Sequence, residues 1–144
     1  MGNICRSPMA EGIMTDIIKQ KKLNIIVDSA GTINYHQGEP PDKRAQNKSK
    51  QHGIDISHLR ARPFVYNDFI NFDHIFVMDT DNFNDIIARA KTPSDKKKVK
   101  LIMNEVFPEQ NIEVPDPYYG GDIGFENVFQ MLSNSCNIIA EKYK

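Results

Sequence analysis

The sequence has little cysteine, no long apolar run and almost no excess charge, and each shortage excludes a class of protein. Two cysteines, Cys5 and Cys136, are too few for a disulfide framework, and we expect both to be reduced in a cytoplasmic protein. No apolar run approaches the roughly 20 residues of a membrane helix, and we expect no signal peptide. The 18 basic and 19 acidic residues leave a net charge of −1, which argues against non-specific nucleic-acid binding.

What the sequence does contain is the pattern of one α/β domain over residues 1–144. A chain of this length has room for one sizeable core. Apolar, β-branched runs predict three buried strands, at residues 24–27, 74–78 and 99–103. Apolar stripes predict four helices, at about residues 7–22, 41–52, after Asp79 and 125–143. Alternating strands and helices predict a parallel sheet covered on both faces.

Local signals place the ends of these helices. Ser7 can act as the N-cap of the first helix, and Pro8 then fits the first helical position. The second helix is predicted to stop at Gly53. The basic run from Lys96 to Lys100 is interpreted as a solvated loop that leads into the third strand.

The first residues combine groups that favour an anion. Gly2 to Ser7 form a short loop before a helix start, where unpaired amides point outward and the helix dipole favours negative charge. Arg6 adds a planar, permanently charged guanidinium that suits two phosphate oxygens. We interpret this loop as a candidate oxyanion cradle. A capped helix with a surface arginine is the alternative.

A second candidate group is Asp116, in the sequence VPDPYYGG. The prolines on either side stiffen the backbone that displays its carboxyl group. Such a carboxyl beside aromatic rings is a reasonable general acid if burial raises its pKa. Tyr118 and Tyr119 could line a pocket for an aromatic substrate. A proline-bounded turn with two half-buried tyrosines is the alternative.

Taken in order along the chain, these segments resemble the low-molecular-weight protein tyrosine phosphatases. The sequence GNICRSPMAE at residues 2–11 is similar to the phosphate-binding loop of that family, commonly C-x-G-N-x-C-R-S-P-x-A-E. Further similar segments are residues 28–32, 35–38, 40–45, 53–62, 72–82 and 116–120. The resemblance covers essentially the whole chain. It implies a three-layer α/β sandwich, with a four-stranded parallel sheet and helices on both faces.

One departure from the family pattern concerns the nucleophile. The pattern C-x5-R, counted back from Arg6, puts the nucleophilic cysteine one residue before Met1. Cys5 matches the second loop cysteine of the family instead, and Cys136 lies on the apolar stripe of the last helix. We therefore expect an N-terminally truncated, inactive chain that lacks the first strand, from a start codon assigned too late. Such a chain should be less stable, or associate by exchanging a strand.

The resemblance also implies roles for particular residues. Arg6 and Asp116 would be catalytic, Asp116 as the acid that protonates the leaving phenolate and then activates water. The phosphate-binding residues would be Gly2, Asn3, Ile4, Cys5, Arg6 and Ser7. Ser29 and His58 would support the loop. The walls of the substrate pocket would be Ile4, Tyr35, Tyr118 and Tyr119.

The implied reaction is hydrolysis of phosphotyrosine through a phosphocysteine intermediate. The substrate would be a phosphotyrosine protein or a small aryl phosphate, inorganic phosphate would be the product, and no metal, cofactor, nucleic acid or membrane is implied. Ile4 favours phosphotyrosine, because related phosphoarginine phosphatases carry threonine there. Thioredoxin-coupled arsenate reductases need additional mid-chain cysteines, and none occurs between Cys5 and Cys136. A catalytically dead module that binds phosphate or other oxyanions is the alternative function.

Overall fold

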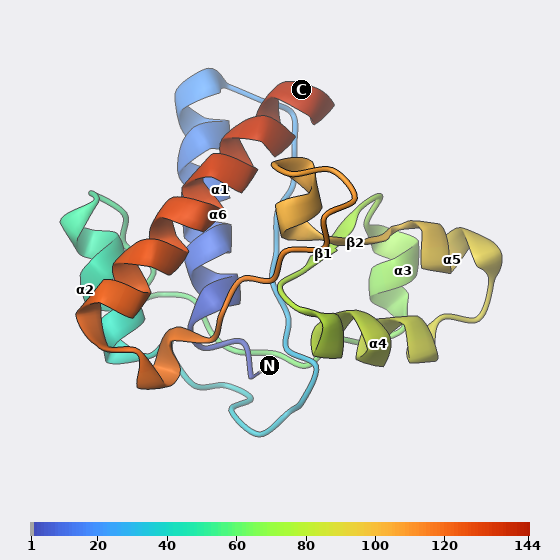
Figure 1. Cartoon of the computed structure of the whole chain (residues 1–144), viewed down its shortest axis with the longest axis horizontal. Helices are drawn as coiled ribbons and strands as arrows, with labels where there is room; N and C mark the ends of the chain where they lie inside the picture. The colour runs from blue at the N-terminus through green and yellow to red at the C-terminus, as the bar shows by residue number, and fades with distance from the viewer. Residues whose placement is uncertain (1) are drawn as a thin grey trace.

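The computed structural model describes residues 2–144, apart from the side chain of Tyr119. Two groups of helices lie on either side of a small central sheet (Figure 1). One group contains α1 (Arg6–Lys21), α2 (Lys43–Gln51) and α6 (Gly121–Tyr143). The other contains α3 (Asn67–Asn71), α4 (Thr80–Arg89) and α5 (Pro93–Lys97). Two short 3₁₀ helices are η1 (Ile102–Glu105) and η2 (Pro117–Tyr119). The arrangement is an α/β fold.

The sheet in the described part of the chain has two parallel strands. Strands β1 (Ile75–Val77) and β2 (Val99–Leu101) pair in the register Ile75 with Val99 and Val77 with Leu101. The second and third predicted strands are therefore confirmed, although both are shorter than predicted. The strand predicted at residues 24–27 is wrong: this segment is extended, but no strand among the described residues pairs with it.

Each helix group has its own apolar core. Helices α1 and α6 cross next to each other, and the core between them and α2 includes Met9, Ile13, Phe125, Val128 and Leu132. The second core lies between the strands and α3 and α4, and includes Phe64, Phe69, Val77, Ile86 and Leu101. Residues of the extended segment 23–27 alternate between half-buried and exposed, and the half-buried ones pack on the first core.

Several predicted helix ends need correction. Helix α1 begins at Arg6 with Cys5 in the N-cap position, so Ser7 lies in the first turn and is not the cap. Pro8 lies in that same turn, where a missing N–H costs no hydrogen bond. Helix α2 ends before Gly53, as predicted, and Gly53 has a φ of +80°. Helix α6 begins at Gly121, four residues before the predicted start.

The basic run and the two shortest helices were not predicted correctly. Lys96 and Lys97 lie in α5, so this part of the run is helical and not a loop. Lys98 turns inward, and its ammonium donates to the carbonyl oxygens of Phe69 and Phe72. No helix among residues 2–144 combines the length and the apolar character that crossing a membrane requires.

Candidate active site

The loop before α1 presents a row of unpaired backbone amides. Asn3 has a φ of +63°, in the left-handed region that asparagine tolerates better than most residues. None of the amides of residues 3–7 donates a hydrogen bond to another described residue. Successive free amides at a left-handed turn and a helix start form a concave site for an anion. The geometry at residues 3–7 therefore fits an oxyanion.

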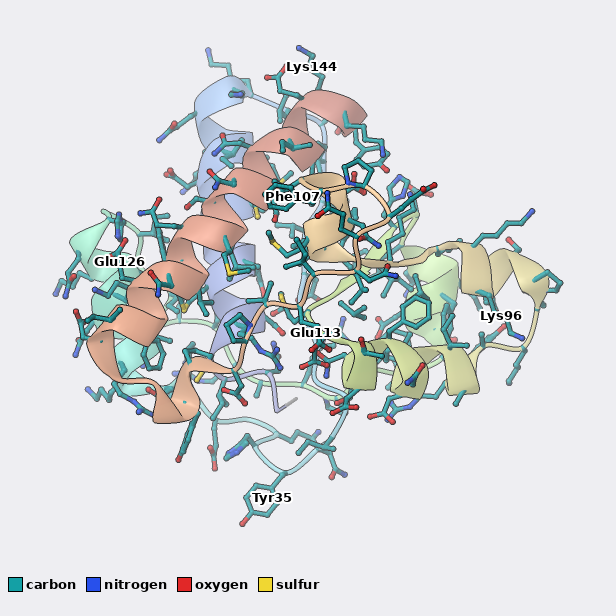
Figure 2. All side chains as sticks on the ribbon, in the orientation of Figure 1. Tyr35, Lys96, Phe107, Glu113, Glu126 and Lys144 are labelled. Carbon is teal, nitrogen blue, oxygen red and sulfur yellow. The ribbon has the colours of Figure 1, made fainter. Side chains whose placement is uncertain are left out.

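Gly2 allows a second loop to approach this site. A Cβ atom at Gly2 would lie 2.5 Å from Cδ2 of His36, closer than side chains normally pack. His36 in turn contacts Oε2 of Glu39 through Nδ1 at 2.8 Å. Tyr35 beside it is 81% exposed and projects away from the body of the protein (Figure 2). A larger residue at position 2 would therefore force the His36 side chain to move.

A chain of hydrogen bonds connects the loop to Ser29, Glu11 and Arg62. The buried amide group of Asn3 donates to Ser29 Oγ at 3.0 Å, and Ser29 Oγ donates to Glu11 Oε1 at 2.6 Å. The backbone amide of Arg62 donates to Asn3 Oδ1 at 3.2 Å. Burial raises the pKa of Glu11, and the bond from Ser29 opposes this rise. Ser29 therefore lies where the sequence predicted a supporting residue.

The supporting role expected for His58 stays a prediction. Its side chain is exposed, and no hydrogen bond joins it to the loop in the described part of the chain. It lies near Glu11 and Asp55 and, as a smaller contribution, helps to lower the pKa of each. Glu11, which the sequence analysis did not single out, makes the contact to Ser29 instead.

Arg6 is buried and anchored to two separate parts of the chain. Its Nη1 donates to Asp79 Oδ2 at 2.8 Å and to the carbonyl oxygen of Val114 at 2.7 Å. No hydrogen bond to another described residue uses its Nη2 or Nε. The guanidinium is therefore fixed on one side and keeps donors on the other, as a group that binds an oxyanion requires.

Asp79 links this site to the fold. Its Oδ1 accepts from the amide of Asn82 at 2.8 Å and caps α4, while Oδ2 pairs with Arg6. Burial tends to raise the pKa of Asp79, but the bonds from Asn82 and Arg6 outweigh it, and the net pKa is lowered. The carboxylate is therefore charged at neutral pH and holds Arg6 in place.

Neither cysteine has the properties of a nucleophile. Burial, reinforced by the charges of Asp42 and Asp116, raises the pKa of Cys5 to about 12. Burial alone raises the pKa of Cys136 to about 12, and its Sγ contacts the carbonyl oxygen of Ala10. Both are free thiols, and reactive cysteines require a lowered pKa. Cys136 belongs to the core, as predicted.

Asp116 caps the short helix η2 next to the loop. Its Oδ1 accepts from the amide of Tyr118 at 3.0 Å, and its negative charge helps to raise the pKa of the Cys5 thiol. Asp116 is exposed, so the burial on which its role as an acid depends is missing in this structure. A bound substrate ring would have to provide it.

Arg44 connects the Asp116 turn to the loop. Its Nη1 donates to the carbonyl oxygen of Tyr118 at 2.5 Å, and its guanidinium lies 4.7 Å from the centre of the Tyr118 ring. It also pairs with Asp42, whose amide donates to the carbonyl oxygen of Ile4 at 2.7 Å. The start of α2 thereby joins both parts of the site.

The predicted walls of a substrate pocket are only partly together. Ile4 is half-buried against the first core, whereas Tyr35 is exposed on a loop and Tyr118 is exposed in η2. The side chain of Tyr119 lies outside the described residues. Among the described residues, no group of His, Cys, Asp or Glu could hold a metal ion.

The partners of the loop were the part that sequence reasoning missed. Asp79 contacts Arg6 and Arg62 contacts Asn3, both from distant positions, whereas Glu11 contacts Ser29, which accepts from Asn3. Asp79 stood at a predicted helix start, which was the available signal for it. Glu11 lies one turn into α1 and gave no separate signal.

Comparison with known proteins agrees with this geometry. The family model described as "Low molecular weight phosphotyrosine protein phosphatase" matches residues 1–144. A putative low molecular weight protein-tyrosine-phosphatase of Synechocystis is 45% identical over 138 residues, covering 94% of this chain and 87% of that protein. The crystal structure of a protein tyrosine phosphatase from Entamoeba histolytica has a TM-score of 0.91 at 40% identity, covering 99% of this chain and 91% of that one.

A third match is the crystal structure of a Drosophila arginine phosphatase. It has a TM-score of 0.90 at 33% identity and covers all of this chain and 94% of that one. The family is one of hydrolases that include protein tyrosine phosphatases. The chain described here belongs to the low molecular weight phosphotyrosine protein phosphatase family.

Proposed function

We propose that residues 2–7 and Asp116 form the phosphate site of an enzyme that hydrolyses phosphotyrosine. The observation that carries this proposal is the row of amides at residues 3–7 without an acceptor in the described part of the chain, beside a fixed Arg6. Three equatorial phosphate oxygens need several donors converging on one point. The Asp116 turn next to this loop supplies a proton donor on the side of the leaving group.

The proposed reaction has two displacements at phosphorus. A cysteine thiolate attacks, an S–P bond forms, the bond from phosphorus to the phenolic oxygen breaks, and Asp116 gives that oxygen its proton. Water then attacks phosphorus, Asp116 takes its proton, the S–P bond breaks and phosphate leaves. Arg6 and the loop amides hold the charge of the phosphoryl group in both steps.

Neither cysteine of this sequence supplies the thiolate in this proposal. Cys5 and Cys136 are buried, and both have raised pKa values. The family pattern puts the nucleophile one residue before Met1. A polypeptide of these 144 residues alone would therefore bind an oxyanion without turning it over. That is the second candidate function, and the buried state of both thiols favours it.

The test compares the 144-residue chain with a version extended by an apolar strand that ends in cysteine. We expect hydrolysis of 4-nitrophenyl phosphate only by the extended protein, and at least 10³-fold less when the added cysteine is serine. Asp116→Asn in the extended protein should lower kcat further for phosphotyrosine than for 4-nitrophenyl phosphate, whose leaving group needs less protonation. Turnover by the 144-residue chain, or an active serine version, would refute the proposal.

In this proposal, the side chain of Ile4 determines which substrate is preferred. An aliphatic side chain at the loop favours an aryl ring over a guanidinium group, although one structural relative is described as an arginine phosphatase. Ile4→Thr in the extended protein should shift kcat/KM toward phosphoarginine relative to phosphotyrosine. An unchanged ratio would show that Ile4 does not determine the choice of substrate. A cytoplasmic location and association by strand exchange stay predictions, the second testable by gel filtration.

A further inference from the structure

The guanidinium of Arg44 ties the Asp116 turn (residues 115–120) to the first core. Its Nη1 donates to the carbonyl oxygen of Tyr118 at 2.5 Å. Its central carbon lies 4.7 Å from the centre of the Tyr118 ring and 5.0 Å from the centre of the Phe125 ring. Phe125 is fully buried in α6, so Arg44 links an exposed turn to a fixed part of the protein.

A bidentate pair with Asp42 fixes the direction of this guanidinium. Arg44 Nε donates to Asp42 Oδ1 and Arg44 Nη2 donates to Asp42 Oδ2, both at 3.1 Å. Two such bonds hold a planar guanidinium in one orientation. Asp42 is itself fixed as the N-cap of α2, where its Oδ1 accepts from the Arg44 amide at 2.8 Å. Because Asp42 uses Nε and Nη2, Nη1 is the nitrogen that reaches Tyr118.

The pair between Arg44 and Asp42 keeps its charges near neutral pH. Burial tends to raise the pKa of Asp42, but the bonds from Arg44 outweigh it, and the net pKa is lowered. The bond to Asp42 raises the pKa of Arg44. The contact between Arg44 and Tyr118 is therefore present over the whole range in which a phosphatase would be assayed.

The backbone around Asp116 has few donors of its own. Pro115 and Pro117 on either side of Asp116 have no N–H group. The Tyr118 amide donates within the turn, to Asp116 Oδ1 at 3.0 Å. Arg44 adds a bond that comes from α2, outside the turn. It therefore fixes the turn relative to the rest of the site.

Arg44 reaches the Asp116 carboxyl group through a single residue. The amide of Tyr118 donates to Asp116 Oδ1, and the carbonyl oxygen of Tyr118 accepts from Arg44. A carboxylic acid that accepts a hydrogen bond at Oδ1 carries its proton on the other oxygen, Oδ2. Holding Tyr118 therefore sets the direction of Oδ2, and a shift of about 1 Å in a reacting group can cost on the order of a hundredfold in rate.

We propose that Arg44 is a positioning residue for proton transfer: it holds Tyr118 so that Oδ2 of Asp116 faces the leaving oxygen. This inference deepens the proposed function and rests on it. The proton passes from Asp116 Oδ2 to the phenolic oxygen as the bond from phosphorus to that oxygen breaks, and Arg44 neither gains nor loses a proton. Lysine has the charge of arginine without the planar fork, so it cannot serve Asp42 and Tyr118 together.

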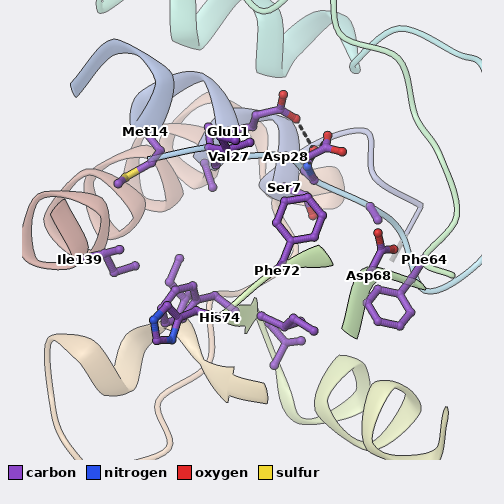
Figure 3. Close-up of a pocket in the computed structure, with 18 of the residues that line it drawn as sticks. Ser7, Glu11, Met14, Val27, Asp28, Phe64, Asp68, Phe72, His74 and Ile139 are labelled. Atoms are coloured by element: carbon purple, nitrogen blue, oxygen red, sulfur yellow. Dashed lines mark hydrogen bonds between the residues drawn. The ribbon is translucent and has the colours of Figure 1, made fainter. Parts of the chain in front are cut away.

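The loop that binds phosphate has supports that do not involve the Arg44 side chain. Asn3 donates to Ser29, and Ser29 donates to Glu11. Figure 3 shows Ser7 and Glu11 beside the cavity between the two halves of the molecule, and Arg44 is not among the described residues that line this cavity. A substitution that retains the positive charge of Arg44 should therefore leave phosphate binding unchanged.

The kinetic experiment compares Arg44→Lys with Lys43→Gln in the extended protein described above. Lys43 is exposed at the start of the same helix, and its substitution is the matched control. General acid catalysis contributes about 10²–10⁴-fold, and a misdirected acid retains part of it, so Arg44→Lys should lower kcat/KM for phosphotyrosine about tenfold. For 4-nitrophenyl phosphate, whose leaving group needs less protonation, the loss should be less than about threefold. Inhibition by inorganic phosphate should not change, and Lys43→Gln should leave all three values unchanged.

A double-mutant cycle separates positioning from a general loss of structure. If Arg44 acts through Asp116, adding Arg44→Lys to Asp116→Asn should not lower kcat/KM for phosphotyrosine any further. A further loss of about tenfold, or equal losses for both substrates in the single variant, would assign Arg44 to the fold or to substrate binding and would overturn the proposal.

Amide hydrogen exchange in the 144-residue chain gives a readout that does not depend on turnover. The Tyr118 amide reports on the bond to Asp116 Oδ1. Arg44→Lys should speed its exchange about tenfold, because the turn loses a charge-assisted hydrogen bond, and Lys43→Gln should not. Unchanged exchange after Arg44→Lys would overturn the proposal.

Failure of this inference can be distinguished from failure of the proposed function. If the extended protein without further substitution does not turn over, the proposed function is refuted and the role of Arg44 falls with it. If that protein is active and Arg44→Lys is equally active on phosphotyrosine, only the role of Arg44 is refuted.

Discussion

The pair between Arg6 and Asp79 permits a prediction that separates charge from helix capping. Asp79 pairs with Arg6 through Oδ2 and caps α4 through Oδ1. Asparagine is a good N-cap residue and is neutral, whereas alanine has neither property. Asp79→Asn thus removes the ion pair and retains the cap, and Asp79→Ala removes both.

The size of each loss follows from burial. The side chains are 4% exposed for Arg6 and 20% for Asp79, so removing the carboxylate leaves a buried guanidinium charge. Breaking a buried pair costs about 3–5 kcal/mol, and the partial exposure of Asp79 favours the low end. We expect Asp79→Asn to lower the free energy of unfolding by about 3 kcal/mol, and Asp79→Ala by about 1 kcal/mol more for the lost cap.

Urea denaturation of the three proteins at pH 7, 5 and 3.5 tests this. The pKa of Asp79 is lowered by folding, so its contribution is fully present above its unfolded value of 3.8 and is lost as pH falls through the folded pKa. The difference between wild type and Asp79→Asn should therefore be equal at pH 7 and 5, and smaller at pH 3.5. A loss below 1 kcal/mol for Asp79→Asn, or one that changes between pH 7 and 5, would refute the reasoning.

Three further predictions concern the loop and the core. Gly2→Ala brings a Cβ to within 2.5 Å of His36 and should weaken phosphate binding roughly tenfold, as measured by calorimetry. Adding His36→Ala should restore binding. Failure to restore it would show that crowding against His36 is not the cause. Cys5 and Cys136, with pKa values raised to about 12, should resist iodoacetamide at pH 8 and react only in urea; labelling of the folded chain within minutes would contradict their burial. Leu132→Ala, at a fully buried site, should cost about 3 kcal/mol in urea denaturation, and a loss below 1 kcal/mol would count against this core.

The apolar periodicity of the sequence predicted the long amphipathic helices but not the short ones. Helix α4 begins after Asp79 as expected, since the cap and the apolar stripe agree. Helices α3 and α5 have five residues each, too few for an apolar stripe to repeat. Their positions depend on tertiary contacts, such as those that draw Lys98 to the end of α3.

The strand predicted at residues 24–27 shows the limit of a local pattern. The apolar, β-branched run gave the correct extended conformation, but a strand also needs a neighbouring backbone, and that neighbour is not encoded in the run itself. The site had the same limit. The loop and Arg6 were evident from adjacent residues, whereas Asp79 reaches Arg6 across 73 positions of the sequence.

Helix α6 has an evolutionary consequence. It follows directly on the Asp116 turn and runs for 23 residues, about 34 Å, with Val128 and Leu132 fully buried along it. Arg44 lies over both the Tyr118 ring and the Phe125 ring, so the turn rests on the same core as the helix. Substitutions that repack this helix would move the proposed proton donor as well. A substitution that changes stability along α6 should therefore also change the position of the Asp116 turn, so the buried positions of α6 should tolerate fewer substitutions than those of α4.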